Sequence, residues 1–345
     1  MNDSLATRSP SPTPEQLTQR LVPPPRFQHA SFEGYRPDPQ FPSQQAAKDR
    51  LVRFAERLGS AQRGGPLRFL RRSASAPARG IYLDGGFGVG KTHLLTALCN
   101  TAQTAAAGST GSGAVYGTFV EYTNLIGVLG YRRAVDLFAG ASVVCIDEFE
   151  LDDVGDTLLM TRMIREISDA GVPVVATSNT LPDALGEGRF AAQDFLREIN
   201  EMADRFEVMR IDGRDYREKD RPADVPALPE TTVLAAAQGD GVTLDAFESL
   251  LEHLATVHPS RYGFLIDGVR RAHLTGVRRV VDHHAGLRLV VLIDRLYDRE
   301  VPLVVSGERP DALFSDELLR SGYRKKYLRC LSRASALAAD GQRAI

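Results

Sequence analysis

A glycine-rich run between two apolar segments constrains the fold of this chain more than any other feature. Residues 85–92 read Gly-Gly-Phe-Gly-Val-Gly-Lys-Thr and fit the pattern Gly-x-x-x-x-Gly-Lys-Thr. A short apolar segment, Ile81–Leu83, precedes the run, and His93–Leu98 has the pattern of an opening helix. A strand, a glycine-rich turn and a helix in this order are typical of a phosphate-binding loop, and they predict binding of a nucleoside triphosphate.

The residue types of this loop suit an anionic ligand. Glycines let backbone N–H groups turn toward phosphate oxygens, and the helix N-terminus adds the positive end of its dipole. Lys91 is expected to reach the β- and γ-phosphates, and Thr92 to offer its hydroxyl to Mg²⁺. The nucleotide-binding residues expected from the motif and the helix start are Gly85, Gly86, Phe87, Gly88, Val89, Gly90, Lys91, Thr92 and His93.

Two carboxylates follow the next strongly apolar strand pattern. Val143–Ile146 is continuous with Asp147 and Glu148. In a phosphate-loop enzyme, a neighbouring strand presents an acidic group to the Mg²⁺ shell, and the residue after it can polarise the attacking water. We therefore expect Asp147 to hold the metal together with Thr92, and Glu148 to act as the general base.

A polar tripeptide, Thr177-Ser178-Asn179, ends a later strand pattern. Ligands of open α/β sheets gather at the carboxyl edge, so Asn179 is expected to hold the lytic water or the γ-phosphate. The alternative is that Asn179 caps the turn before Pro182. No Asn-Lys-x-Asp motif follows, which favours ATP over GTP.

Alternating strand and helix patterns place the loop in an α/β fold. Further strands are predicted at residues 115–122, 142–146, 172–177 and 206–211. Helices are predicted at residues 46–58, as a preamble to the loop strand, and at 158–167. Strands that alternate with helices imply a parallel sheet that is covered on both faces.

A proline-rich stretch, Arg221–Pro229, is typical of a linker between two domains. Beyond it, we predict helices at 244–254, at 287–297 and from 323 onward, with a strand at 301–305. The predicted domains are a disordered Ser/Pro-rich tail at 1–34, a core with its N-terminal helix at 35–217, a linker at 218–230 and a C-terminal α/β lid domain at 231–345.

One internal similarity links the two predicted domains. Residues 172–185 and 301–313 both begin Val-Pro-x-Val and later contain Pro-Asp-Ala-Leu. We expect two similar helix–turn–strand units rather than a duplicated domain.

Composition excludes several classes of function. The formal net charge of −2 gives no basic field that would favour nucleic-acid binding by charge alone. Three widely spaced cysteines suggest neither a disulfide framework nor a zinc site. The chain lacks the run of about 18 apolar residues that a membrane span needs, and its first 28 residues lack a secretory signal. We therefore expect a cytoplasmic protein.

The acidic strand end lies in a longer pattern that indicates a family. Residues 145–156, Cys-Ile-Asp-Glu-Phe-Glu-Leu-Asp-Asp-Val-Gly-Asp, resemble the Asp-Glu-Phe-x-x-x-Asp-(Ile/Val)-x-Asp signature of the ZapE-type cell-division ATPases. These are AAA+ ATPases and bacterial relatives of the mitochondrial lactation-elevated ATPase. Three further segments agree with the family, at 175–179, 215–217 and 329–333.

The resemblance extends over roughly residues 35–340. It implies an AAA+ phosphate-loop core with a C-terminal lid, and ATP hydrolysis with Mg²⁺ by a ring or other oligomer of this chain. It also implies remodelling of a protein partner, with the division protein FtsZ as the favoured partner.

An AAA+ ring needs an arginine from the neighbouring subunit to neutralise charge that develops on the γ-phosphate. Candidates are Arg189, Arg197 and Arg205, and the glycines beside Arg189 match the family best. Arg333, on the predicted C-terminal helix, can contact the nucleotide of its own subunit from the lid, with a surface salt bridge as the alternative.

Two other functions compete with this interpretation. Helicase loaders and initiators share the Asp-Glu strand end and the Thr-Ser-Asn strand tip, so a DNA-associated AAA+ loader or initiator is the first alternative. A nucleotide-gated scaffold with negligible turnover is the second, and the intact Glu148 argues against it.

Overall fold

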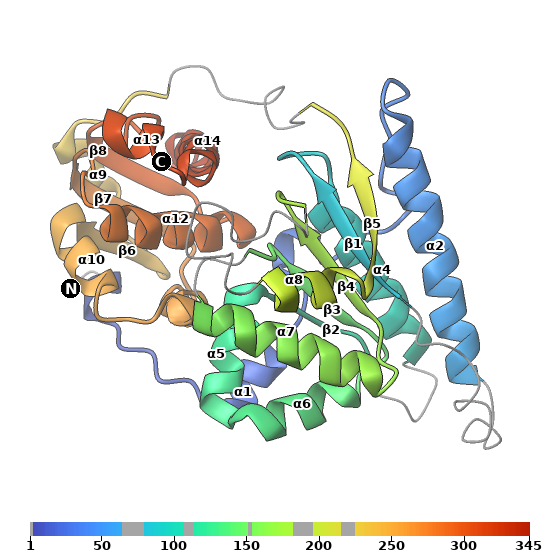
Figure 1. The fold of residues 1–345 in the computed structure, drawn as a ribbon. Helices are drawn as coiled ribbons and strands as arrows, with labels where there is room; N and C mark the ends of the chain where they lie inside the picture. The colour runs from blue at the N-terminus through green and yellow to red at the C-terminus, as the bar shows by residue number, and fades with distance from the viewer. Residues whose placement is uncertain (1–2, 64–78, 107–112, 151–153, 182–195, 215–224) are drawn as a thin grey trace. The chain divides into compact units, whose positions relative to one another are not determined.

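The computed structural model describes residues 3–63, 79–106, 113–150, 154–181, 196–214 and 225–345. The chain divides into two compact units (Figure 1). We call residues 14–23 and 27–216 the phosphate-loop unit, and residues 1–13, 24–26 and 217–345 the C-terminal unit. In the described ranges, no helix has the length and apolar character needed to cross a membrane.

The phosphate-loop unit is built on a five-stranded sheet in the order β2-β3-β4-β1-β5. The strands are β1 (Gly80–Gly85), β2 (Val115–Thr118), β3 (Val144–Asp147), β4 (Val174–Ser178) and β5 (Phe206–Ile211). All four neighbouring pairs are parallel, so the carboxyl ends of the strands meet at one edge. The predicted α/β class with a parallel sheet is confirmed.

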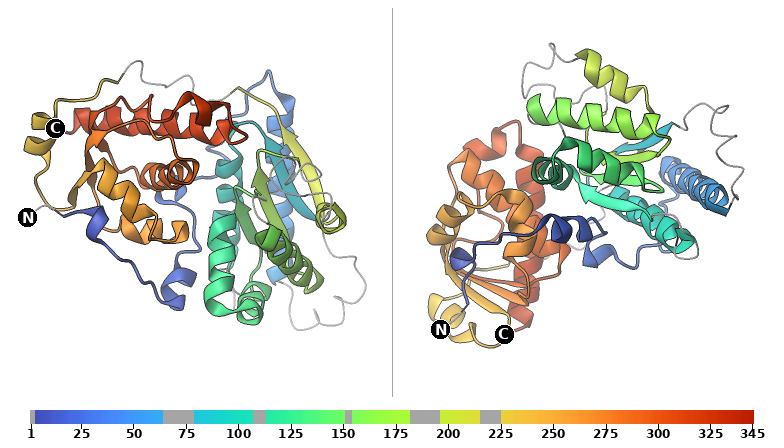
Figure 2. Two further views of the ribbon diagram at one scale, coloured as in Figure 1. Left: turned by 60° about the vertical axis from the view of Figure 1, so that its left-hand side comes forward. Right: turned by 90° about the horizontal axis from the view of Figure 1, so that it is seen from below.

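Helices cover both faces of this sheet, because its central strands bury side chains on both sides. The helices are α1 (Pro14–Gln19), α2 (Pro42–Arg63), α4 (Lys91–Ala106), α5 (Phe119–Leu129), α6 (Tyr131–Ala139), α7 (Val154–Asp169) and α8 (Leu196–Ala203). Figures 1 and 2 show α7 on one face and α2 with α4 on the other. Leu51 and Phe54 of α2 pack with Leu94 and Leu98 of α4 in the core on that second face.

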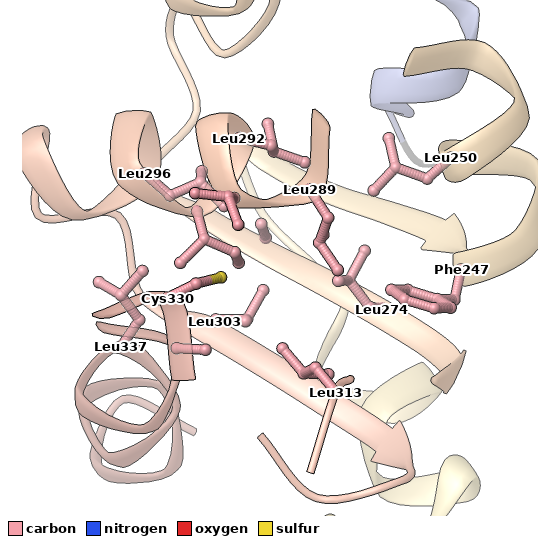
Figure 3. Packing of buried hydrophobic residues seen from close by; sticks show 14 of the residues in the cluster. Phe247, Leu250, Leu274, Leu289, Leu292, Leu296, Leu303, Leu313, Cys330 and Leu337 are labelled. Atoms are coloured by element: carbon pink, nitrogen blue, oxygen red, sulfur yellow. The ribbon is translucent and has the colours of Figure 1, made fainter. Parts of the chain in front are cut away.

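The C-terminal unit contains a second parallel sheet, with three strands in the order β6-β7-β8. Its strands are β6 (Val242–Ala246), β7 (Arg271–Val277) and β8 (Leu303–Gly307). Its longer helices are α9 (Glu230–Ala236), α10 (Phe247–Leu254), α12 (His283–Asp298) and α14 (Arg324–Arg343), with the short helices α11 (Tyr262–Leu265) and α13 (Asp316–Arg320). Figure 3 shows Leu289, Leu292 and Leu296 of α12 packed over Leu274 and Leu303 of the sheet.

Two predicted elements were wrong at the point where a strand passes directly into a helix. The strand predicted at 115–122 ends at Thr118, and α5 begins at Phe119. Glu121 explains this end, since its carboxylate accepts a 2.7 Å hydrogen bond from the backbone N–H of Thr118 and so caps the helix. The helix predicted at 244–254 likewise divides into strand β6, which ends at Ala246, and helix α10.

The N-terminal residues differ from the disordered tail that their composition predicted. Leu5 is fully buried in the core of the C-terminal unit. The carboxylate of Asp245 accepts hydrogen bonds from the Ser4 hydroxyl (2.6 Å), the Leu5 N–H (3.1 Å) and the Ala6 N–H (2.9 Å). A buried carboxylate far along the chain thus satisfies the polar groups of this segment, and the low hydrophobicity of its sequence could not reveal that partner.

The similar segments at 172–185 and 301–313 begin with equivalent helix–turn–strand junctions. After α7, Val172 donates its N–H to Ile167 O at 3.0 Å, and after α12, Val301 donates to Leu296 O at 3.0 Å. The residue before each valine has a positive φ, 83° at Gly171 and 54° at Glu300. The two helices therefore end in the same left-handed turn before the parallel strand that follows.

Candidate nucleotide site

The glycine-rich loop joins the carboxyl end of β1 to the first residue of α4. Gly85 ends the strand and Lys91 begins the helix. Gly88 and Gly90 have φ values of 69° and 87°, in the left-handed region that favours glycine. The loop therefore needs glycine at both positions, and it delivers its backbone to the start of a 16-residue helix.

Lys91 connects three segments at this edge of the sheet. Its side-chain Nζ donates to the carbonyl oxygens of Gly85 (2.7 Å) and Gly86 (2.6 Å) and to Oδ1 of Asn179 (2.9 Å). Asn179 is within reach because β4 pairs with β1, with Ser178 opposite Asp84. The structure thus brings together the lysine and the amide that were predicted to contact the phosphates.

Asp147 lies at the end of β3, with 5% of its surface exposed, and hydroxyl groups surround it. Its Oδ1 accepts from the hydroxyls of Thr92, at 3.3 Å, and Thr177, and its Oδ2 accepts from the Tyr116 hydroxyl at 2.8 Å. Burial raises the pKa of Asp147, the charge of Glu148 adds to this, and the hydroxyl hydrogen bonds oppose it. The predicted pair Thr92 and Asp147 is in direct contact.

Glu148 adopts a backbone conformation that is uncommon for a residue with a side chain. Its φ is 52°, in the left-handed region. Its N–H donates to the Thr177 hydroxyl at 3.1 Å, and the next N–H, of Phe149, donates to Thr177 O at 2.7 Å. Thr177 of β4 therefore fixes the turn that carries the candidate base directly beyond Asp147.

The oxygen atoms at this edge fit a divalent magnesium ion. Mg²⁺ prefers oxygen ligands, and in nucleotide enzymes one or two protein ligands suffice because phosphates and water supply the rest. Thr92 and Asp147 offer such a hydroxyl and carboxylate within hydrogen-bond distance of each other. The described ranges contain no group of three or more His, Cys, Asp or Glu side chains that could hold a metal ion.

The loop and the start of α4 contact residues 31–35, in the N-terminal part of the phosphate-loop unit. The Tyr35 hydroxyl donates to Val89 O at 2.9 Å, and His93 Nε2 lies 2.9 Å from Ser31 O. His93, which lies in the first turn of α4 and was predicted to bind nucleotide, thus contacts the backbone of Ser31. Sequence reasoning assigned no role to Tyr35, Tyr116 or Thr177, because no motif spacing marks a residue that contacts the loop or Asp147 from another strand or from the segment before α2.

Two of the three candidate arginine fingers lie in the described part of the chain, and each pairs with a carboxylate outside the loop site. Arg189 lies outside the described residues. Arg197 of α8 has 86% of its side chain exposed and pairs with Glu201 at 3.1 Å. Arg205 pairs with Asp169 at 2.8 Å, and its carbonyl accepts from Gly80 at the amino end of β1, opposite to the loop.

Arg333 lies on α14 of the C-terminal unit. Its guanidinium pairs with Asp294 at 2.5 Å and lies over the Tyr297 ring, 5.0 Å from the ring centroid. Arg329, one turn before it, pairs with the same Asp294 at 2.8 Å. The buried carboxylate of α12 thus holds both arginines of the predicted lid motif in one cluster.

Comparisons with known proteins found a matching family model and several similar proteins. A family model described as AFG1-like ATPase matches residues 11–232 and 227–343. Cell division protein ZapE of Escherichia coli (strain K12) is 24% identical over 305 residues, which cover 76% of this chain and 79% of that protein. Lactation elevated protein 1 homolog B of Danio rerio is 24% identical over 229 residues, 55% of this chain and 44% of that protein. Domain III of the Thermotoga maritima replication initiation protein DnaA aligns with 56% of this chain and 70% of its own, at 18% identity and a TM-score of 0.40.

Proposed function

The chain belongs to the AFG1-like ATPase family, and we propose that it hydrolyses ATP with Mg²⁺ at the edge formed by β1, β3 and β4. One observation carries this proposal: the Lys91 ammonium, the Thr92 hydroxyl and the Asp147 carboxylate meet at the glycine-rich loop, with Glu148 directly beyond. A cation for the phosphates, oxygen ligands for the metal and a carboxylate for the water are the groups that this reaction needs.

Each residue has a distinct role in the proposed reaction. Loop N–H groups and Lys91 hold the phosphates and neutralise charge that develops on them. Thr92 and Asp147 would hold Mg²⁺, and the bound ion would stabilise negative charge on the phosphates. Glu148 accepts the proton of the attacking water, and Asn179 orients that water or the γ-phosphate beside it.

Purified protein tests this activity directly. We expect phosphate release from ATP that depends on Mg²⁺ and stops in the presence of a chelator. Lys91→Ala should weaken nucleotide binding by about ten- to a hundredfold or more, because the ammonium makes charge-assisted bonds that are worth about 1.5–3 kcal/mol or more. Unchanged ATP affinity of Lys91→Ala in calorimetry would contradict the phosphate-loop assignment.

We further propose that the active form is a ring or other oligomer in which Arg189 completes the site of a neighbour. The support is the resemblance of Gly186–Arg189 to the arginine-bearing motif of the family. Arg189→Ala should bind ATP normally and hydrolyse it slowly, because the lost charge acts on the transition state. Mixing Arg189→Ala with Glu148→Gln subunits should restore part of the turnover, since one supplies the base and the other the arginine.

A mixture that forms hetero-oligomers and is no more active than its separate parts would contradict Arg189. Arg205 would then be the better candidate of the two described arginines. It lies at the edge of the sheet opposite to the loop of its own subunit, and this position supports a role at a neighbour's site.

The proposed partner is a protein of the cell-division machinery, with FtsZ as the first to test. Its support is the family resemblance and the 24% identity to cell division protein ZapE. Glu148→Gln, which holds ATP, should sediment with FtsZ polymers more than the nucleotide-free protein does. Failure of both states to sediment with FtsZ polymers would reject FtsZ and leave the ATPase proposal intact. The net charge of −2 gives no support to the DNA-associated alternative.

A further inference from the structure

Tyr35, in the N-terminal part of the phosphate-loop unit, contacts the phosphate loop at Val89 and Gly90. The hydroxyl of Tyr35 donates to Val89 O at 2.9 Å, and its ring lies against Gly90. A Cβ atom added at Gly90 would lie 2.4 Å from a ring carbon, so the ring fills the space beside that residue. Tyr35 is itself buried in the core with Leu94 of α4, which makes it a rigid support.

This contact sets the orientation of one peptide unit of the loop. A trans peptide is planar, so its carbonyl oxygen and its N–H point in opposite directions. A bond that holds the Val89 carbonyl toward Tyr35 therefore directs the N–H of Gly90 away from Tyr35. Backbone N–H groups of such loops are the donors that cradle phosphate oxygens.

The loop needs a restraint of this kind at this position. Gly90 has a φ of 87° and, as a glycine, loses more conformational freedom on ordering than any other residue type. The Val89 side chain contributes a second restraint, since it packs between Gly85 and Gly213, whose added Cβ atoms would lie 3.2 and 3.0 Å from it. Within the described ranges, the Val89 carbonyl accepts a side-chain hydrogen bond from Tyr35.

We propose that Tyr35 is a positioning residue for ATP, which holds the Val89–Gly90 peptide in the orientation that binds phosphate. The inference rests on the proposed ATPase function. Burial raises the pKa of Tyr35 to about 12, so its hydroxyl remains a donor throughout the neutral pH range. Tyr35 acts through the loop backbone.

The expected effect is a loss of preorganisation. If the loop occupies its binding conformation only part of the time, the apparent Kd rises in inverse proportion to that fraction. One hydrogen bond to a carbonyl is worth a factor of about two to tenfold in such an equilibrium. Tyr35→Phe removes the hydroxyl and keeps the ring, so the core around it remains packed.

The test compares Tyr35→Phe with a matched control, Tyr262→Phe. Tyr262 is also buried, and its hydroxyl also donates to a backbone carbonyl, that of Leu254 at 2.7 Å, in the C-terminal unit. Calorimetry with Mg²⁺ and a nonhydrolysable ATP analogue should give a Kd raised by about two- to tenfold for Tyr35→Phe and an unchanged Kd for Tyr262→Phe. The KM for ATP should rise by the same factor with little change in kcat.

Three outcomes separate the alternatives. A Kd for Tyr35→Phe equal to that of the wild type, while Lys91→Ala weakens binding at least tenfold, would overturn the role of Tyr35 and leave the proposed function standing. A lowered kcat with unchanged KM would show that Tyr35 serves only to keep the protein folded, and would also overturn the proposal. Absence of binding by the wild-type protein would instead refute the proposed function itself.

Discussion

The hydroxyl of Tyr116 donates a 2.8 Å hydrogen bond to Oδ2 of Asp147, from the edge strand β2 to the end of the neighbouring strand β3. The bond is buried, and it leaves Oδ1 of the same carboxylate to Thr92 and Thr177. Tyr116 therefore orients the candidate metal ligand without lying in the loop itself. Partners of this kind tune a metal site through the ligand that they hold.

Removal of the Tyr116 hydroxyl should weaken the use of magnesium. We expect Tyr116→Phe to raise the Mg²⁺ concentration needed for half-maximal ATP hydrolysis by about tenfold, the scale on which outer partners of metal ligands act. Tyr122→Phe is the control, because the Tyr122 hydroxyl donates to Cys145 O at 3.1 Å and does not contact Asp147. Equal Mg²⁺ dependence of the two variants would show that Tyr116 has no part in the metal site.

Asn179 offers a test between a catalytic and a structural role. The turn after β4 is closed by Ser178, whose hydroxyl accepts from the Thr180 N–H at 3.1 Å, while the Asn179 amide contacts Lys91. We therefore expect Asn179→Ala to reduce kcat by about 10²-fold, the cost of one preorganised polar group, with little loss of thermal stability. A lowered melting temperature with normal kcat would instead support the capping role.

The backbone strain at Glu148 predicts that this residue lowers the stability of the protein although its activity needs it. Its φ of 52° costs about 1 kcal/mol for a residue with a side chain. A similar hydrogen bond occurs in the second sheet at Gly276, which lies at an irregularity in strand β7. Gly276 has a φ of 64°, and its N–H donates to the Ser306 hydroxyl at 3.3 Å, as Glu148 donates to Thr177. Glu148→Gly should therefore raise the melting temperature while it abolishes turnover.

Glu148→Gln is the control for that prediction. It keeps a side chain at the same φ, so it should lose turnover without gaining stability. If Glu148→Gly melts no higher than Glu148→Gln in differential scanning calorimetry, the turn is not strained by its side chain.

A buried histidine should make the C-terminal unit sensitive to acid. His273 of β7 has no exposed surface, lies 3.0 Å from Val233 O through Nδ1, and accepts from Arg271 Nε at its Nε2. Burial lowers the pKa of His273 below 6.5, with the charge of Arg271 acting in the same direction and the Val233 bond opposing it. Just below pH 6.5, His273 is therefore protonated in the unfolded chain and still neutral in the folded unit.

The sign of this effect follows from proton linkage. The stabilisation is complete above pH 6.5 and is lost as pH falls from there toward the lowered folded pKa, with a slope of at most about 1.4 kcal/mol per pH unit. His273→Asn should remove that part of the slope in denaturant unfolding between pH 7.5 and 5. Identical slopes in the wild type and His273→Asn would contradict the prediction.

Local patterns explain why part of the fold and site was predictable. The loop from Gly85 to Thr92 and the acidic strand end at Asp147 depend on residues that are adjacent in the chain, so their chemistry is visible in the sequence. Strand β5 was predicted at its observed bounds, Phe206–Ile211, because polar residues mark both of its ends.

Contacts between distant residues explain what could not be predicted. Tyr35 contacts Val89 across 54 positions and Ser4 contacts Asp245 across 241, and no spacing rule connects either pair. The change from strand to helix at Thr118 was missed because apolar residues continue across it, and only the Glu121 carboxylate marks the boundary.

Rapid-quench kinetics of Glu148→Gln tests the central claim most directly. The variant, mixed with ATP and Mg²⁺, should bind nucleotide with the affinity of the wild type and form ADP about 10²-fold more slowly, because the group that accepts the proton of water is lost. ADP formation at the wild-type rate, with the same bound nucleotide, would show that Glu148 is not the base and that the edge formed by β1, β3 and β4 does not hydrolyse ATP in the way proposed.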